Sequence, residues 1–120
     1  MKTNYETIDS LNSAFSNLPL KSIDIMTAAE NMIVLEPHLK AALSVKDKLI
    51  KENTGGKEQI SNNHKNWHKF TLDYGEILKK EINIEGLQKI KKSNIDLDRP
   101  SNVNLQNLIK VLKQNGLLEE

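Results

Sequence analysis

Apolar residues recur at helical spacing along most of the chain, and glycines and prolines divide this pattern into segments. A first helix is predicted over residues 5–17. A long second helix is predicted over residues 22–53, with Ser22 or Asp24 placed to cap its start and Gly55–Gly56 to stop it. The chain is therefore expected to be mainly helical.

The long predicted helix carries apolar residues on most of its circumference. One stripe consists of Ile25, Ala28, Ala29, Met32, Leu35, Leu39, Ala42, Leu43, Leu49 and Ile50. A second stripe consists of Met26, Ile33, Val34, Ala41 and Val45, and a narrow polar face holds Thr27, Asn31 and His38. A helix that is apolar on most sides usually has neighbours on several of them, so we expect this one to be central.

Pro37 lies inside this apolar segment. Proline lacks a backbone N–H and disfavours helix at the preceding residue, Glu36. A straight helix over residues 22–53 would be about 48 Å long. That is long for a compact domain of this size, whose radius of gyration is about 13–14 Å. We therefore predict that the helix either breaks and restarts at Pro37, or kinks there as one helix.

The second half of the chain mixes helical and alternating patterns. A helix is predicted over residues 58–80, marked by Ile60, Trp67, Phe70, Tyr74, Ile77 and Leu78. Alternation over residues 81–91 and 94–98 predicts two strands paired as a β-hairpin, with a bulge at Gly86. Pro100–Ser101 should open a last helix over residues 102–115, and Gly116–Leu117 should close it in a Schellman motif.

These elements predict one domain, residues 1–120, of the mainly α (α+β) class. We expect a bundle of about four helices, with a kinked or broken long central helix and a small β-hairpin.

Composition narrows the functional classes. The chain has no cysteine, which excludes disulfides, thiolate zinc sites and cysteine nucleophiles. Its longest apolar run is Met32–Leu35, too short to span a membrane, and we expect a cytoplasmic protein. The net charge is +1 and Arg99 is the single arginine, which argues against nucleic-acid binding.

Two pairs of residues are candidate metal ligands. His64 and His68 would share one helical face, but Lys65 stands where the zinc protease motif HExxH has glutamate. Asp96 and Asp98 would share one side of a strand, where paired carboxylates can bind Mg²⁺. Neither pair has an evident third ligand or phosphate loop. We therefore predict no enzyme activity, no catalytic or metal-binding residue and no cofactor.

Large apolar side chains are the remaining candidate site residues. Trp67, Phe70 and Tyr74 are expected to pack in the core, although Trp and Tyr are also frequent anchors in protein interfaces. The candidate partner-binding residues are Met26, Ile33, Val34 and Trp67, to the extent that they are exposed.

The order of several short motifs resembles a family of small proteins of unknown function encoded by phages and prophages of low-GC Gram-positive bacteria. The family motifs are LP-x-K, a Leu-Glu pair in the long helix, and F-x-x-x-[YL]-x-E-[IL]-L. The matching residues here are Leu18, Pro19, Lys21, Leu35, Glu36, Phe70, Tyr74, Glu76, Ile77 and Leu78. Pro37 has no counterpart in the family pattern.

Within this phage setting, the length and composition also resemble phage inhibitors of defence-associated sirtuins. These sirtuins are large host proteins that deplete NAD when they sense phage tail components. The resemblance implies a noncatalytic anti-defence inhibitor that acts in the infected host cell by stoichiometric binding. The alternatives are a phage structural or assembly accessory protein, and a small winged-helix-like DNA-binding regulator suggested by the capped amphipathic segment 108–120.

Overall fold

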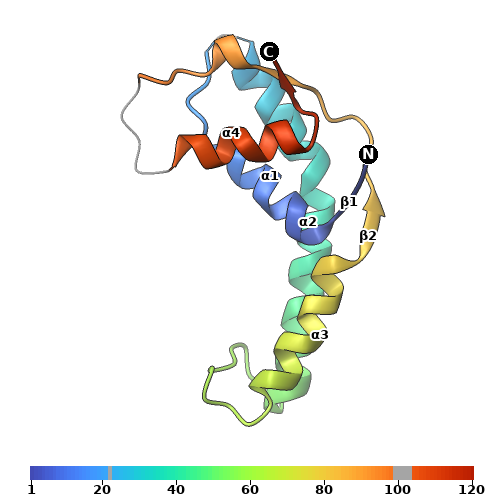
Figure 1. The fold of residues 1–120 in the computed structure, drawn as a ribbon. Coiled ribbons are helices and arrows are strands. Elements are labelled where there is room, and N and C mark those ends of the chain that lie inside the picture. Colours follow the sequence, from blue (N-terminus) through green and yellow to red (C-terminus); the bar gives the residue numbers. More distant parts are fainter. Residues whose placement is uncertain (22, 99–103) are drawn as a thin grey trace.

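The computed structural model describes residues 1–21, 23–98 and 104–120 (Figure 1). Within these ranges the helices are α1 (Tyr5–Asn17), α2 (Asp24–Thr54), α3 (Trp67–Lys79) and α4 (Leu105–Gln114), with a short 3-10 helix at Lys92–Asn94. The strands are β1 (Lys2–Asn4), β2 (Glu81–Asn83), β3 (Ile90–Lys91) and β4 (Leu118–Glu119). The predicted mainly helical fold with a small β part is confirmed. Two predicted caps, Ser22 and Pro100–Ser101, lie outside the described residues.

The molecule is elongated, with principal extents of 50 × 31 × 20 Å and a radius of gyration of 16.8 Å. Helix α2 runs along most of its length (Figure 1). At the wide end, which we call the head, α1 and β3 pack on α2, α4 packs on α1, and β1, which pairs with β2, contacts α1. At the narrow end, which we call the arm (residues 43–79), α3 and a loop pack against α2, and α3 also contacts α1.

Helix α2 continues without interruption through Pro37, so the predicted break is wrong; the kink stays a prediction. The expectation of a break rested on compactness, and the chain avoids that limit by extending α2 into the arm. Pro37 is exposed, so the Ile33 carbonyl that loses its helical partner can bond to water. Packing of α2 against α1 and α3 offsets the local cost of the proline.

Helix α1 has the predicted bounds, because its start and end carry clear local signals. The Asn4 side chain accepts a hydrogen bond from the Thr7 N–H at 2.8 Å and caps the helix. Four apolar residues on one face of α1 are buried in the head: Ile8, Leu11, Ala14 and Phe15. They form the core together with Leu35 of α2, Ile90 of β3 and Leu112 of α4.

The end of α4 is the predicted Schellman motif. Leu117 N–H donates to the Leu112 carbonyl at 2.9 Å, and Gly116 N–H donates to the Lys113 carbonyl at 3.2 Å. Gly116 has φ +69°, a conformation that glycine adopts without steric cost. Leu117 is buried and packs into the same core as Leu112.

Helix α3 starts at Trp67, so the predicted helix over residues 58–80 is wrong in its first third. Turns occupy this region instead: His64 N–H donates to the Ser61 carbonyl, and the Asn66 side chain donates to the Asn53 carbonyl at 2.9 Å. The sequence pattern extended the helix back to Ile60. Ile60 instead lies in a loop, from which its side chain lines the same cavity as apolar residues of α3.

The predicted β-hairpin between residues 81–91 and 94–98 does not form. Strand β2 instead pairs antiparallel with β1, with Thr3 opposite Ile82, and β3 pairs parallel with β4, with Ile90 opposite Leu118. Gly86 lies at φ +93° in the irregular segment between these pairs, outside any strand, so it makes no bulge. Ile82 and Ile84, which alternate with polar residues in the sequence, both pack in or against the core. Alternation does not show which other strand pairs with the one it predicts.

Two polar side chains of α2 hold this extended segment in place. The Asn31 amide donates to the Gln88 carbonyl and accepts from the Gln88 N–H, both at 2.9 Å. The Asp24 carboxylate accepts from the Lys91 N–H at 2.8 Å and from the Asn94 side chain at 3.1 Å. Asp24 is therefore not the helix cap that its position suggested.

Candidate protein-interaction surface

The N-terminal half of α2 buries polar as well as apolar residues. Asp24, Thr27 and Asn31 are buried beside Ala28 and Leu35. Its outward face carries large apolar residues, with exposed fractions of 72% for Ile23, 60% for Ile25, 60% for Met26 and 67% for Ile33. Single exposed apolar residues are ordinary, whereas a cluster of them marks a contact surface.

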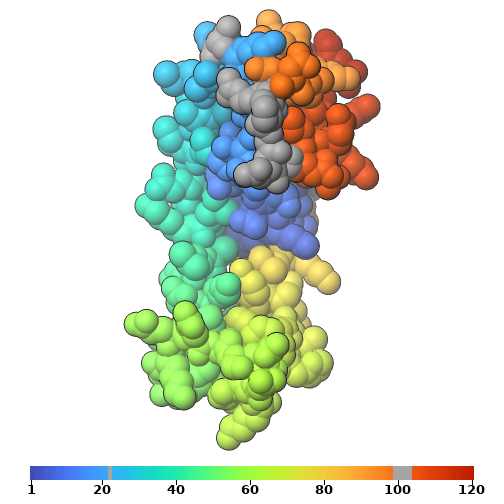
Figure 2. Space-filling view, turned by 90° about the vertical axis from the view of Figure 1, so that its left-hand side faces the viewer, coloured from blue at the N-terminus to red at the C-terminus, as the bar shows by residue number. Residues whose placement is uncertain are grey.

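The exposed apolar residues at the start and along the outward side of this half of α2 are what we call the outer strip: Ile23, Ile25, Met26, Ile33 and Pro37. Met26, Ile33 and Pro37 are spaced by seven and four residues, so they lie on one side of the helix. The strip is about 16 Å long between Met26 and Pro37. Figure 2 shows this part of α2 in cyan along the edge of the head, with no other element covering it.

Polar groups surround the outer strip. Glu30 accepts a hydrogen bond from the Gln88 side chain at 2.8 Å. Glu36 and Lys40 form an ion pair at 2.8 Å. The Lys40 ammonium lowers the pKa of Glu36 through a hydrogen bond and its charge, and Glu36 raises the pKa of Lys40 in the same way. An apolar centre with a polar rim is the usual composition of a protein interface.

The four predicted partner-binding residues lie in different places. Met26 and Ile33 are in the outer strip. Val34 is partly buried and packs against the core, and a Cβ built at Gly86 would lie 3.8 Å from its Cγ2. Trp67 lies in the arm at the start of α3, near Ile50 of α2. Ile50 is about 25 Å from Ile33 along the axis of α2. The structure therefore brings together only Met26 and Ile33.

The sequence analysis missed Ile23, Ile25 and Pro37 as surface residues. The sequence did contain one signal, the polar face of the long helix formed by Thr27 and Asn31. Had this face been assigned to the interior, the apolar residues on the opposite side of the helix would have been expected at the surface. What could not be read from the sequence is the bond from Asn31 to Gln88, which lies 57 positions away.

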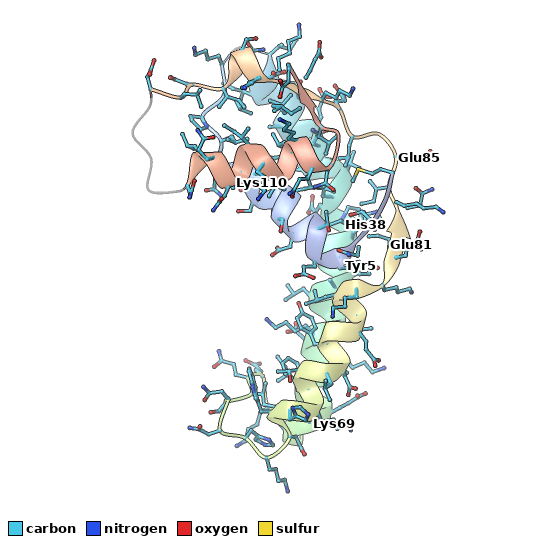
Figure 3. All side chains as sticks on the ribbon, viewed as in Figure 1. Tyr5, His38, Lys69, Glu81, Glu85 and Lys110 are labelled. Atoms are coloured by element: carbon cyan, nitrogen blue, oxygen red, sulfur yellow. The ribbon has the colours of Figure 1, made fainter. Side chains whose placement is uncertain are left out.

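The arm contains Trp67, Phe70 and Tyr74. It also contains a separate cavity of about 460 Å³ between α2, α3 and the loop. The Phe70 ring is 5.7 Å from the Trp67 ring and stacks on Tyr74 at 5.8 Å. Burial raises the pKa of the Tyr74 hydroxyl, and the nearby Asp9 carboxylate raises it further. The expected core packing applies fully to Phe70, which is buried; Trp67 and Tyr74 are partly exposed. Lys69 on α3 and Lys110 on α4 mark the arm and the head in Figure 3.

The candidate metal ligands are not arranged as predicted. His64 precedes α3 and its Nδ1 accepts a hydrogen bond from the Asn66 N–H at 3.0 Å, whereas His68 is exposed within the helix. Asp96 accepts a hydrogen bond from the Asp98 N–H in a turn rather than a strand. The described part of the chain has no group of three or more His, Asp or Glu side chains that could hold a metal ion.

Nowhere in the described ranges does a helix combine the length and apolar content needed to cross a membrane. Comparisons with protein-family models, curated proteins and solved structures found no match to this chain.

Proposed function

We propose that this chain is a noncatalytic protein-binding module that inhibits a bacterial anti-phage defence protein by occupying its surface. The observation that carries the proposal is the outer strip, which exposes large apolar residues while the opposite face of the same helix buries polar ones. Recognition of one helix face by a groove uses anchors at this kind of spacing. A chain of this size can supply the roughly 800 Å² per partner of a standard interface.

The resemblance to phage proteins supplies the identity of the proposed partner. We propose a sirtuin-type host protein that depletes NAD, blocked either in sensing the phage or in its activation. An inhibitor that acts by occupancy works stoichiometrically. With a net charge of +1, the chain has little long-range field to hold a partner, so apolar contact should dominate the affinity.

The test is a titration of the chain against such a defence protein and its phage trigger, with NAD loss and complex formation measured together. Ile33→Ser and Met26→Ser should each weaken binding by at least about thirtyfold if the residue is a central anchor. Leu72→Ser is the matched control, because Leu72 is similarly exposed (57%) but lies on α3 in the arm.

Full NAD loss at saturating protein, with no complex on a sizing column, would refute the sirtuin assignment. Capture of a virion protein or of DNA from infected cells would favour the assembly or DNA-binding alternative instead. If Ile33→Ser and Leu72→Ser weakened binding equally, the outer strip would not be the contact surface.

A further inference from the structure

We propose that the arm cavity is a binding site for a small compound with a flat apolar body and one anionic group. The site is independent of the outer strip and of any protein partner. The cavity is lined by Lys46, Ile50, Gln59, Ile60, Trp67, Phe70, Thr71, Tyr74, Gly75 and Leu78.

The size and walls of the cavity fit one small ligand. Its volume of about 460 Å³ lies within the roughly 300–1,000 Å³ typical of ligand pockets. The walls come from three segments: α2, α3 and the loop that carries Gln59 and Ile60. The cavity is open to solvent, and mainly apolar side chains line a hollow that the chain itself does not fill.

The aromatic residues give the cavity a surface suited to flat groups. Phe70 and Tyr74 stack with their planes 5° apart, and Trp67 continues the row at an angle of 41° to Phe70. Phe70 is buried between the other two rings, so a ligand ring would contact the partly exposed Trp67 and Tyr74, which adds affinity beyond simple burial. The Gln59 and Thr71 side chains can supply the few polar contacts that orient a ligand.

Charge determines which ligands the cavity favours. Lys46 is the single charged residue among those that line it, and no carboxylate lies among them. The Lys46 Nζ lies 5.5 Å from the centre of the Tyr74 ring and is partly buried. An anionic group on the ligand would pair with this ammonium in a partly water-excluded site, where charge-assisted bonds are strong.

Gly75 leaves the backbone of α3 bare where it lines the cavity. It lies inside α3 without the positive φ that requires glycine, and a Cβ built there would meet no atom within 4 Å. A larger side chain at this position would therefore occupy open space in the cavity without a clash.

The test uses a matched pair of fluorescent probes, 8-anilinonaphthalene-1-sulfonate and its neutral analogue N-phenyl-1-naphthylamine. Trp67 is the only tryptophan and lines the cavity, so energy transfer from tryptophan to the probe reports binding there. We expect one sulfonate probe per chain, bound more tightly than the neutral probe.

Variants separate charge from shape. Lys46→Gln should weaken the sulfonate probe about tenfold, the effect of one charge-assisted hydrogen bond, and change the neutral probe less than about twofold. Lys48→Gln is the control, because Lys48 is also on α2 but does not line the cavity. Gly75→Leu should abolish binding of both probes by filling the space, while the melting temperature rises.

The proposal is overturned if Lys46→Gln and Lys48→Gln have equal effects, or if the neutral probe binds as tightly as the sulfonate. It is also overturned if Ile33→Ser, in the outer strip, removes the transfer signal while Gly75→Leu leaves it. None of these measurements uses a protein partner, so they can fail without affecting the proposed inhibitor role.

Discussion

At the scale of single residues, Asn31 and Asp24 link distant parts of the chain. Both are buried on α2, and their bonds reach the backbone of residues 88 and 91. Between β2 and β3 the chain forms no strand, so these side chains bond backbone groups there and at Lys91 in place of water. The sequence placed Asn31 on a polar face correctly. It could not show that the face is buried, because the bonding partner is remote.

Asn31→Ala should lower the free energy of unfolding by about 1–3 kcal/mol, because it removes the two hydrogen bonds between the buried Asn31 side chain and the Gln88 backbone. Urea unfolding monitored by circular dichroism would measure the change. Asn62→Ala, at an exposed loop position, is the control and should change stability by less than about 0.5 kcal/mol. Equal values for the two variants would show that the Asn31 bonds contribute no net stability.

At the scale of elements, local signals decided how well each one could be predicted. Helix α1 was predicted to its ends because a cap and a proline mark them. The start of α3 was missed because Ile60 continues the helical spacing from a loop. Alternation predicted strand in the segment that contains β2 and β3, but it gave a false strand at 94–98 and missed β1 and β4. The partners of β2 and β3 lie at the two ends of the chain, and pairing over such separations leaves no local trace.

Helix α2 provides the element-scale test through Pro37→Ala. Alanine restores the N–H that can bond to the Ile33 carbonyl, and Pro37 is exposed, so no packing is lost. We expect the free energy of unfolding to rise by about 1–3 kcal/mol. Urea unfolding would measure the change, with Ala41→Gly, also exposed on α2, as the opposite control that should lower stability. A loss of stability in Pro37→Ala would indicate that a bend at this residue is needed for α2 to contact α1 and α3 together.

At the scale of the whole molecule, the head and the arm differ in how much they bury. Helix α1 in the head buries four apolar side chains, whereas α3 buries only Phe70. The outer strip and the cavity therefore lie on parts of unequal stability. The helical spacing of apolar residues predicted the mainly helical class but not this division, because an elongated and a compact bundle have the same spacing and the same apolar content.

We expect amide hydrogen exchange to be faster in α3 than in α1 by at least about tenfold, because local opening of the arm exposes less apolar surface. Peptide-resolved exchange measured by mass spectrometry would test this. Phe70→Ala should raise exchange in α3 and leave α1 unchanged. Uniform protection across both helices would mean that the molecule opens only as one cooperative unit.

Because α2 continues without interruption through Pro37, it also fixes the direction in which the outer strip faces relative to the arm. Each residue turns the helix by about 100°, so one residue inserted after Ala41 would rotate the outer strip by that angle about the axis of the arm. Seven inserted residues would nearly restore the original direction and add about 10 Å of length. Any partner or assembly that contacts both ends would therefore tolerate changes in the length of α2 only in steps of about two turns.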